Sequence, residues 1–225
     1  MISIIVFPGS NCDRDLKFAI QRKLKIQAEY IWHKASHIKK TKLIFIPGGF
    51  SFGDHLRAGI LAAKSPAVKE IVRFSKKGVP IVGICNGFQI LTESKLLPGT
   101  LMKNINTKFI CKTVNLKVNN NTVFSREFKK NQIIRFPIAH AQGNYYADEL
   151  ELKNIYENEQ IVFRYCSKNG EITKTSNPNG SKLNIAGIIS KNRKILGLMP
   201  HPERAIGLKD SSDGNIFFKS LKDIL

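Results

Sequence analysis

The strongest signal for a fold lies in Val79-Pro80-Ile81-Val82-Gly83-Ile84-Cys85-Asn86-Gly87-Phe88-Gln89-Ile90-Leu91. The apolar run before the cysteine predicts a buried strand over residues 79–84, and the residues after it predict a helix over 87–94. Cys85 stands on the sharp turn between the two, where a nucleophile is held clear of its neighbours. Glycine at positions 83 and 87 fits this turn, because two backbone segments approach too closely there for a Cβ.

Two interpretations of Cys85 are open from this stretch alone. The helix N-terminus faces the sulfur, and its unpaired N–H groups favour negative charge there, which indicates a nucleophile. A free cysteine is more often a small buried apolar residue without chemistry. The catalytic interpretation therefore needs a partner base elsewhere in the chain.

The residues before this turn alternate between strand-like and helix-like patterns. Continuous apolar runs predict strands at 2–7, 28–32 and 43–46, and apolar residues at helical spacing predict helices at 13–25 and 66–77. Such alternation is typical of a parallel sheet that is covered by helices on both faces.

The second half of the chain changes character. Strand-like runs at 112–118, 133–138, 161–165, 185–189 and 195–199 are separated by polar loops, and residues 215–225 predict a closing helix. No repeat or linker divides the chain. We therefore expect a single α/β domain over residues 1–225, with a mostly parallel central sheet flanked by helices and a small antiparallel extension.

Composition excludes several classes of protein. The 225 residues are 42% hydrophobic, and no apolar stretch is long enough for a transmembrane helix, so no membrane partner is expected. The start lacks the basic region of a secretory signal. The four cysteines form no CxxC pair, which favours reduced thiols and a cytoplasmic protein. The net charge of +19 is spread along the chain without a nucleic-acid-binding motif, so no nucleic-acid partner is expected.

A candidate base is His201, in Met199-Pro200-His201-Pro202-Glu203-Arg204, directly after a predicted strand. Sites in open α/β sheets form at the carboxyl ends of strands, and both Cys85 and His201 occupy such ends. In an extended segment Glu203 points the same way as His201 and can orient its imidazole. The alternative is a surface turn with a local salt link to Arg204. Together with the Cys85 turn, the pattern predicts a Cys–His–Glu catalytic site.

A glycine-rich loop, Pro47-Gly48-Gly49-Phe50-Ser51-Phe52-Gly53-Asp54, follows another strand end. Its bare backbone can present an N–H above Cys85, and with the N–H of Asn86 it would make two donors for an oxyanion. The chain contains no phosphate-binding GxxxxGK[ST] motif, and no His/Cys/carboxylate group has metal-ligand spacing, so no metal is expected.

These motifs resemble a known family. Gly83 through Gln89, followed far downstream by Pro200-His201-Pro202-Glu203, is similar to the class I (triad) glutamine amidotransferases. The form is that of the glutaminase subunits of phosphoribosylformylglycinamidine synthase, which the chain resembles from residue 6 to about 205. The stretches that carry this resemblance are 7–13, 47–59, 177–181, 185–188 and 199–204.

The resemblance implies a flavodoxin-like fold and a thioester mechanism on glutamine, with Cys85 as nucleophile, His201 as base and Glu203 as its orienter. It also implies an oxyanion hole at Gly49 and Asn86. The substrate-binding residues that we expect on this basis are Gly48, Phe50, Gln89 and His140. The chain departs from the family pattern at Phe52, His55 and Ala141-Gln142.

The same resemblance implies partners. They are an ATP- and magnesium-using synthetase subunit, which aminates formylglycinamide ribonucleotide, and a small bridging subunit; this chain itself needs no cofactor. Two other functions remain open at this stage. One is another cysteine hydrolase on the same scaffold, such as a γ-glutamyl hydrolase or a peptidase, and the other is a non-enzymatic basic binding protein.

Overall fold

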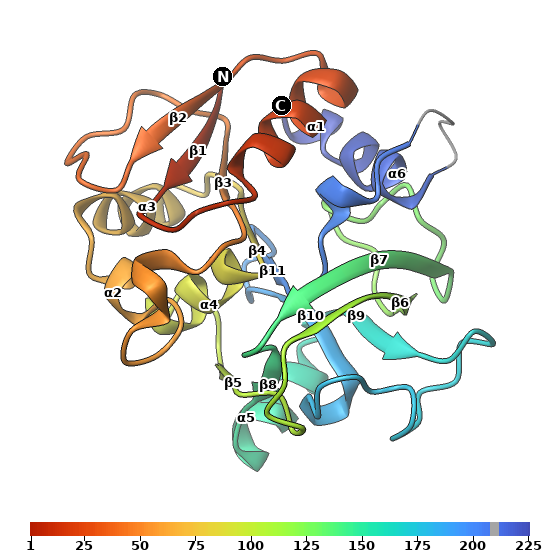
Figure 1. Cartoon of the computed structure of the whole chain (residues 1–225). Helices are drawn as coiled ribbons and strands as arrows, with labels where there is room; N and C mark the ends of the chain where they lie inside the picture. The colour runs from red at the N-terminus through yellow and green to blue at the C-terminus, as the bar shows by residue number, and fades with distance from the viewer. Residues whose placement is uncertain (208–211) are drawn as a thin grey trace.

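One mixed sheet runs through the computed structural model, which describes residues 1–207 and 212–225 (Figure 1). Within these residues the sheet has nine strands in the order β2-β1-β3-β4-β11-β10-β9-β6-β7. Five strands form its parallel part: β1 (Ile2–Val6), β2 (Ala28–Trp32), β3 (Leu43–Ile46), β4 (Ile81–Ile84) and β11 (Ile195–Leu198). The antiparallel part consists of β10 (Ile185–Ile189), β9 (Ile161–Cys166), β6 (Ile110–Val118) and β7 (Ile133–His140).

Helices cover both faces of the parallel part. Parallel strands are joined by right-handed crossovers, so a helix leading toward one edge of the sheet lies on the opposite face from a helix leading toward the other edge. Helix α1 (Asp13–Leu24) therefore lies on one face and packs beside α6 (Asp213–Ser220). The other face carries α2 (Ile60–Ala63), α3 (Pro66–Lys76) and α4 (Asn86–Glu93). In the part of the chain that is described, no helix has the length and apolar character needed to cross a membrane.

The predicted α/β fold is confirmed, and the predicted strands agree with the structure to within one or two residues at most ends. The antiparallel part is larger than expected, because four strands of the main sheet belong to it and a separate pair, β5 (Thr100–Met102) and β8 (Asn144–Tyr146), adds to it. Both halves of the chain contribute strands to one sheet, as a single domain requires; the extent of that domain stays a prediction.

Two predictions about helices were incomplete. The closing helix was predicted over 215–225, but α6 ends at Ser220 and a 3₁₀ turn, Lys222–Ile224, follows. Helix α5 (Glu149–Glu157) was not predicted, because Ile155 is its one buried residue and too little apolar periodicity remains. Its start does carry a signal, since the Asp148 carboxylate accepts a hydrogen bond from the Glu151 N–H as an N-cap.

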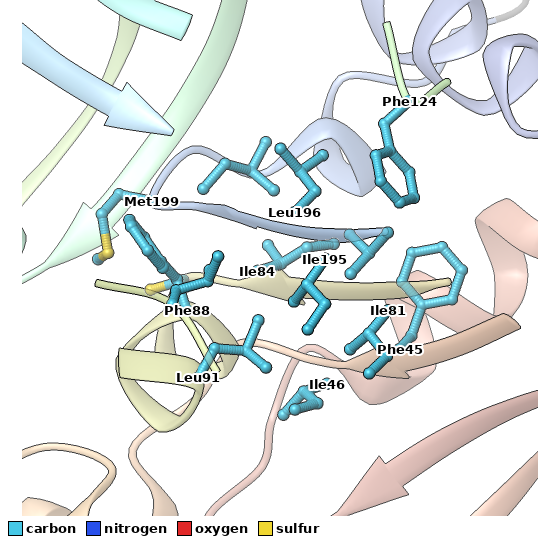
Figure 2. Close-up of a cluster of buried hydrophobic side chains, with 14 of the residues drawn as sticks. Phe45, Ile46, Ile81, Ile84, Phe88, Leu91, Phe124, Ile195, Leu196 and Met199 are labelled. Atoms are coloured by element: carbon cyan, nitrogen blue, oxygen red, sulfur yellow. The ribbon is translucent and has the colours of Figure 1, made fainter. Parts of the chain in front are cut away.

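The core between β4, β11 and α4 fixes the position of Cys85 (Figure 2). Phe88 and Leu91 of α4 pack on glycines in the two strands: a Cβ on Gly197 would lie 2.1 Å from Phe88 Cδ2, and one on Gly83 would lie 2.5 Å from Leu91 Cδ1. Gly87 approaches β3 even more closely, because its Cβ would lie 2.0 Å from the Ile46 carbonyl oxygen. The helix can therefore sit this close to the sheet only with glycine at these positions.

This packing predicts different costs for two glycine substitutions. We expect Gly87→Ala to lower the free energy of unfolding by about 3 kcal/mol, because the backbone of β3 must move to admit the methyl group. The matched control is Gly78→Ala, whose Cβ would meet nothing within 4 Å and whose cost comes from a φ of +75° alone, about 1 kcal/mol. Urea unfolding of both variants measures the difference, and equal losses would contradict the packing argument.

Candidate active site

Cys85 occupies a strained turn between β4 and α4. Its φ of 52° and ψ of −105° are unusual for a residue with a side chain. Its N–H donates to the Leu198 carbonyl at 2.8 Å, and its own carbonyl accepts the first hydrogen bonds of α4, from Phe88 and Gln89. The sulfur lies 3.7 Å from the Ala139 carbonyl oxygen, and only 4% of the residue is exposed. The predicted strand–cysteine–helix turn is thus present in the structure.

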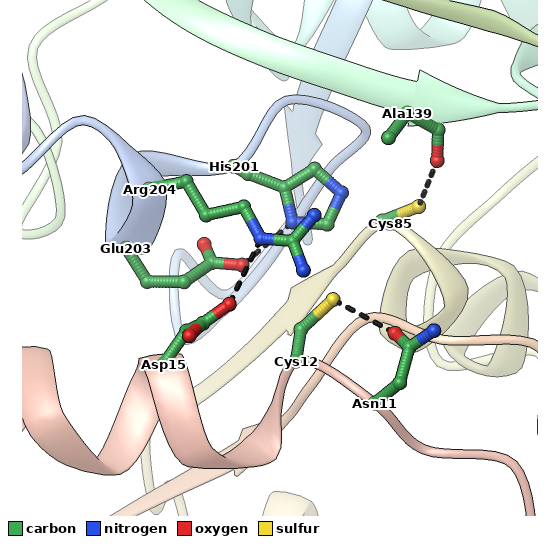
Figure 3. A network of polar contacts seen from close by, with 8 residues as sticks. All are labelled: Asn11, Cys12, Asp15, Cys85, Ala139, His201, Glu203 and Arg204. Carbon is green, nitrogen blue, oxygen red and sulfur yellow. Dashed lines mark hydrogen bonds and ion pairs between the residues drawn. The ribbon is translucent and has the colours of Figure 1, made fainter.

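His201 follows the neighbouring strand. Strands β4 and β11 are parallel and in register, with Leu198 opposite Ile84, so the residues that follow them emerge side by side. A Cβ built on Gly48 would lie 2.7 Å from His201 Cε1 and 3.4 Å from Cys85 Cβ, which shows that the two side chains converge on one point (Figure 3).

Glu203 binds the imidazole of His201. The distance between His201 Nδ1 and Glu203 Oε1 is 2.6 Å, and both side chains are 1% exposed. The predicted contact exists, but the predicted extended backbone does not: Pro202–Arg204 form a 3₁₀ turn. Proline fits the first position of such a turn because it lacks an N–H to leave unpaired. The turn brings the carboxylate back under the imidazole.

The electrostatics of this pair favour a charged imidazole. Burial works against charge on His201, but the Glu203 carboxylate and the Cys85 sulfur outweigh it and raise the pKa of His201 well above its usual value. Nδ1 carries the proton that is shared with Glu203, and the opposite nitrogen, Nε2, is buried without a hydrogen-bond partner among the described residues. Nε2 is therefore the atom available for proton exchange with a substrate.

A second sulfur, which sequence reasoning missed, lies in the same place. Cys12 is buried, and its thiol donates to Asn11 Oδ1 at 3.1 Å. Ligand atoms of Cys12, His201 and Glu203 all lie within 4.8 Å of one another, which is close enough to hold a metal ion. Spacing could not reveal this group because its members lie at opposite ends of the chain; the expectation that no metal takes part stays a prediction. Burial raises the pKa of the Cys12 thiol and keeps it protonated.

A cavity of about 390 Å³ joins these groups. Its wall includes both Cys85 and His201 and four of the other predicted site residues: Gly49, Phe50, Gln89 and His140. Three predicted residues, Gly48, Asn86 and Glu203, border the site without lining the cavity. A larger cavity of about 590 Å³ against α5 contains no cysteine or histidine in its described wall, so the chemistry is concentrated in the smaller one.

The predicted oxyanion donors have suitable surroundings. Asn86 is the first residue of α4, where backbone N–H groups have no acceptor within the helix. Its side chain is turned away, since Oδ1 accepts from the Ser51 N–H and Nδ2 donates to Gln89 Oε1. Gly49 lies in the facing wall, where a Cβ would approach the Gly9 carbonyl oxygen to 2.5 Å, so only glycine fits.

The two predicted polar substrate contacts differ in kind. Both ends of the Gln89 amide are occupied, by Asn86 and by the Gln142 carbonyl at 2.7 Å, so this side chain is built into the wall. His140 instead keeps a free nitrogen. Its Nδ1 donates to Asn104 Oδ1 at 3.0 Å, and its Nε2 has no partner within the described chain. Burial and the charge on His201 lower the pKa of His140 to about 4, so Nε2 is an acceptor at neutral pH.

Comparison with known proteins places the chain among the glutamine amidotransferases. The model of the CobB/CobQ-like glutamine amidotransferase domain matches residues 1–213. The chain is 48% identical over 222 residues to the PurQ subunit of phosphoribosylformylglycinamidine synthase from Moorella thermoacetica. The aligned region covers 98% of this chain and 94% of that relative. It is also 48% identical over 221 residues to PurQ from Aquifex aeolicus, with 97% of each chain covered.

A solved structure agrees with these relatives. The structure of PurLQS from Thermotoga maritima contains a chain that is 39% identical, with a TM-score of 0.85 over 99% of this chain and 97% of that one. The chain described here belongs to the PurQ family of glutamine amidotransferase subunits. The resemblance read from the sequence motifs is confirmed.

The site predicts an order of reactivity among the cysteines. We expect iodoacetamide at pH 7 to modify Cys85 first, because it lines the cavity beside the His201 imidazole. Cys12 and Cys166 should react slowly, since burial raises the pKa of both thiols. Cys111, which is exposed and outside the cavity, is the internal reference. Peptide mass spectrometry over time measures the order, and faster modification of Cys111 than of Cys85 would contradict this assignment.

Proposed function

We propose that this chain hydrolyses glutamine to glutamate and ammonia through a thioester on Cys85. It delivers the ammonia to a synthetase subunit that converts formylglycinamide ribonucleotide to formylglycinamidine ribonucleotide in purine biosynthesis. The observation that carries the proposal is the buried His201–Glu203 pair at 2.6 Å, converging with Cys85 on one cavity. The naming of its relatives as PurQ subunits supports the substrate and the pathway.

In the first half of the reaction the Cys85 thiolate attacks the side-chain amide carbon of glutamine. The amide oxygen becomes an oxyanion, which the N–H groups of Gly49 and Asn86 stabilise. His201 then gives the proton on Nε2 to the departing nitrogen, ammonia leaves, and a glutamyl thioester remains on Cys85.

In the second half His201 acts in reverse. Its neutral Nε2 removes a proton from a water molecule, the hydroxide attacks the thioester carbonyl, and glutamate leaves as the Cys85 thiolate is restored. Glu203 holds Nδ1 in place throughout and stabilises the imidazolium each time it forms. His140 lines the same cavity with a free acceptor nitrogen and contacts the substrate.

The product sets a requirement on the assembly. Ammonia that reaches bulk water is protonated and loses its nucleophilic lone pair, so it must pass directly to the subunit that uses it. We place ATP and magnesium on that synthetase subunit and include a small bridging subunit in the complex. The similarity to a chain in the structure of PurLQS from Thermotoga maritima supports a complex with other subunits. Free cysteines, among them the exposed Cys111, support a reducing, cytoplasmic location.

Membership of this family argues against the two alternative functions, another cysteine hydrolase and a non-enzymatic basic binding protein. A non-enzymatic basic binding protein would not need a buried Cys–His–Glu arrangement, and the relatives are named as synthase subunits rather than as hydrolases or peptidases. Glutamine is therefore the substrate that we test first.

Removal of the nucleophile should abolish the reaction. We expect Cys85→Ala to lose glutamine hydrolysis to below about 1 part in 10⁴ of the parent rate, because no thioester can form. Ammonia release, coupled to glutamate dehydrogenase, measures this rate. The matched control is Cys111→Ala, which removes an exposed sulfur outside the cavity and should retain the parent rate. Appreciable turnover by Cys85→Ala would remove Cys85 from the mechanism.

Loss of the orienting carboxylate should be nearly as severe. Glu203→Gln removes the charge that raises the pKa of His201, so we expect that pKa to fall and kcat to drop about 100-fold or more. The sign follows from the attraction: without Glu203 the imidazolium is less stable and loses its proton at a lower pH. A pH–rate profile together with thermal unfolding separates this effect from misfolding. A near-normal rate in a folded variant would reduce Glu203 to a structural role.

A further inference from the structure

A carboxylate without a partner lies in the wall of the active-site cavity. Asp54 lines the same 390 Å³ space as Cys85 and His201, and it is the one carboxylate among the described residues of that wall. Its Oδ1 is buried and has no hydrogen-bond partner among the residues that the structure describes. Neither the catalytic mechanism nor the predicted substrate contacts use this group.

The backbone that carries Asp54 is held in an unfavourable conformation. Phe52 and Asp54 both have a φ of 54°, and Gly53 between them has a φ of 69°. A left-handed conformation costs a residue with a side chain about 1–2 kcal/mol, so two such residues indicate that the surrounding contacts enforce this path. The loop therefore places Asp54 at the cavity in a backbone conformation that its own residues disfavour.

Specific contacts fix this loop. The Phe52 N–H donates to the Pro8 carbonyl at 2.7 Å, and the Gly53 N–H donates to the Phe50 carbonyl at 2.9 Å. The Phe52 ring packs edge-on against the buried His33, with centroids 5.1 Å apart. Asp54 thus projects from a rigid support, as a preorganised binding group requires.

The negative charge on Asp54 has no positively charged partner among the described residues. Burial raises the pKa of Asp54 to about 6, so the group is still mostly ionised at neutral pH. The chain has 36 lysines and arginines and a net charge of +19. Arg204, the one arginine among the described residues of the wall, is already paired with Asp15 at 3.0 Å. An anion left unpaired in so basic a protein is expected where a ligand supplies the cation.

We propose that the Asp54 carboxylate binds the α-ammonium group of glutamine, an inference that rests on the function proposed above. Glutamine carries an ammonium at one end and, at the other, the amide that Cys85 attacks. With one end on Asp54 and the other at Cys85, the cavity would select an α-amino acid rather than a simple carboxamide. Asp54 would then determine specificity without taking part in bond making or breaking.

Two substrates and two variants test this pairing. Glutaramate (5-amino-5-oxopentanoate) is glutamine without its α-amino group. We expect Asp54→Asn to lower kcat/KM for glutamine about 10- to 100-fold, chiefly through KM, because one charged hydrogen-bonded contact is lost from the bound state. The same variant should hydrolyse glutaramate within about 2-fold of the parent chain, since that substrate has no ammonium to lose. Glu171→Gln, which removes one exposed carboxylate outside the cavity, should change neither value.

Binding by calorimetry gives a readout that does not depend on turnover. In a Cys85→Ala background, glutamine should bind at least about 10-fold more tightly than glutaramate, and Asp54→Asn should abolish this preference. Thermal unfolding should show Asp54→Asn to be as stable as the parent or more stable, because the substitution removes a buried charge without a partner. Asp54→Glu, which keeps the charge, is the second variant should Asp54→Asn fail to fold; it should retain part of the preference.

The outcomes separate this inference from the proposed function. If the parent chain hydrolyses glutamine but Asp54→Asn keeps the preference over glutaramate, the ammonium assignment is wrong and the amidotransferase mechanism stands. Equal losses on both substrates would also overturn the assignment, because they would place Asp54 in the chemistry or in the fold. If neither hydrolysis nor binding of glutamine is found for the parent chain, both proposals fail together.

Discussion

The parallel pairing of β4 with β11 is the constraint on which the rest of the molecule depends. In this register Gly83 lies opposite Gly197 and Ile84 opposite Leu198, so the chain leaves both strands at the same edge of the sheet. The paired glycines leave room for Phe88 and Leu91, and α4 can therefore start directly at the end of β4. A shift of one residue would place side chains where the helix packs and would separate Cys85 from His201. The catalytic geometry is thus a consequence of backbone register and not of contacts between the catalytic residues alone.

The free energy that stabilises the site comes from the surrounding fold and not from contacts between the site residues. Three buried atoms in the wall of the cavity have no hydrogen-bond partner in the described chain: the acceptors Asp54 Oδ1 and His140 Nε2, and the protonated His201 Nε2. Each such atom costs about 1–3 kcal/mol in the absence of a ligand. A continuous apolar core beneath the sheet end supplies the free energy that offsets this cost. All three line the cavity that we propose for glutamine, so the groups that destabilise the empty site are also free to bind a ligand there.

Features marked by a pattern within a short stretch of sequence could be predicted, whereas features that depend on contacts between distant residues could not. The Cys85 turn and the His201–Glu203 pair were predictable because glycine spacing and strand ends are local patterns. The 3₁₀ turn at Pro202 was not predictable, because the same residues also fit an extended segment. Only in the folded chain does the His201 N–H, directly before this turn, donate to the Pro137 carbonyl of β7. Cys12 was missed because it meets His201 only in the folded chain, where the Cys12 N–H donates to the Gly48 carbonyl at 3.2 Å. Helix α5 has too narrow a buried face to register as a periodic pattern.

Backbone strain occurs in two segments that border the cavity. Cys85, Phe52, Asp54 and Leu56 all have a positive φ, and the loop from Phe52 to Leu56 and the turn at Cys85 both border the cavity. Local propensity disfavours each of these conformations, so the path of the loop from Phe52 to Leu56 could not be predicted from its own residues, whereas the glycines around Cys85 did mark its turn. Tertiary contacts reverse that preference: Ser51 is bound by the Asn86 side chain, and the Phe52 N–H by the Pro8 carbonyl. The Asn86 bond ties the loop to α4, so the strained loop and the turn at Cys85 are directly linked. A substitution in either segment should therefore also change the conformation of the other, even though the two share no helix or strand.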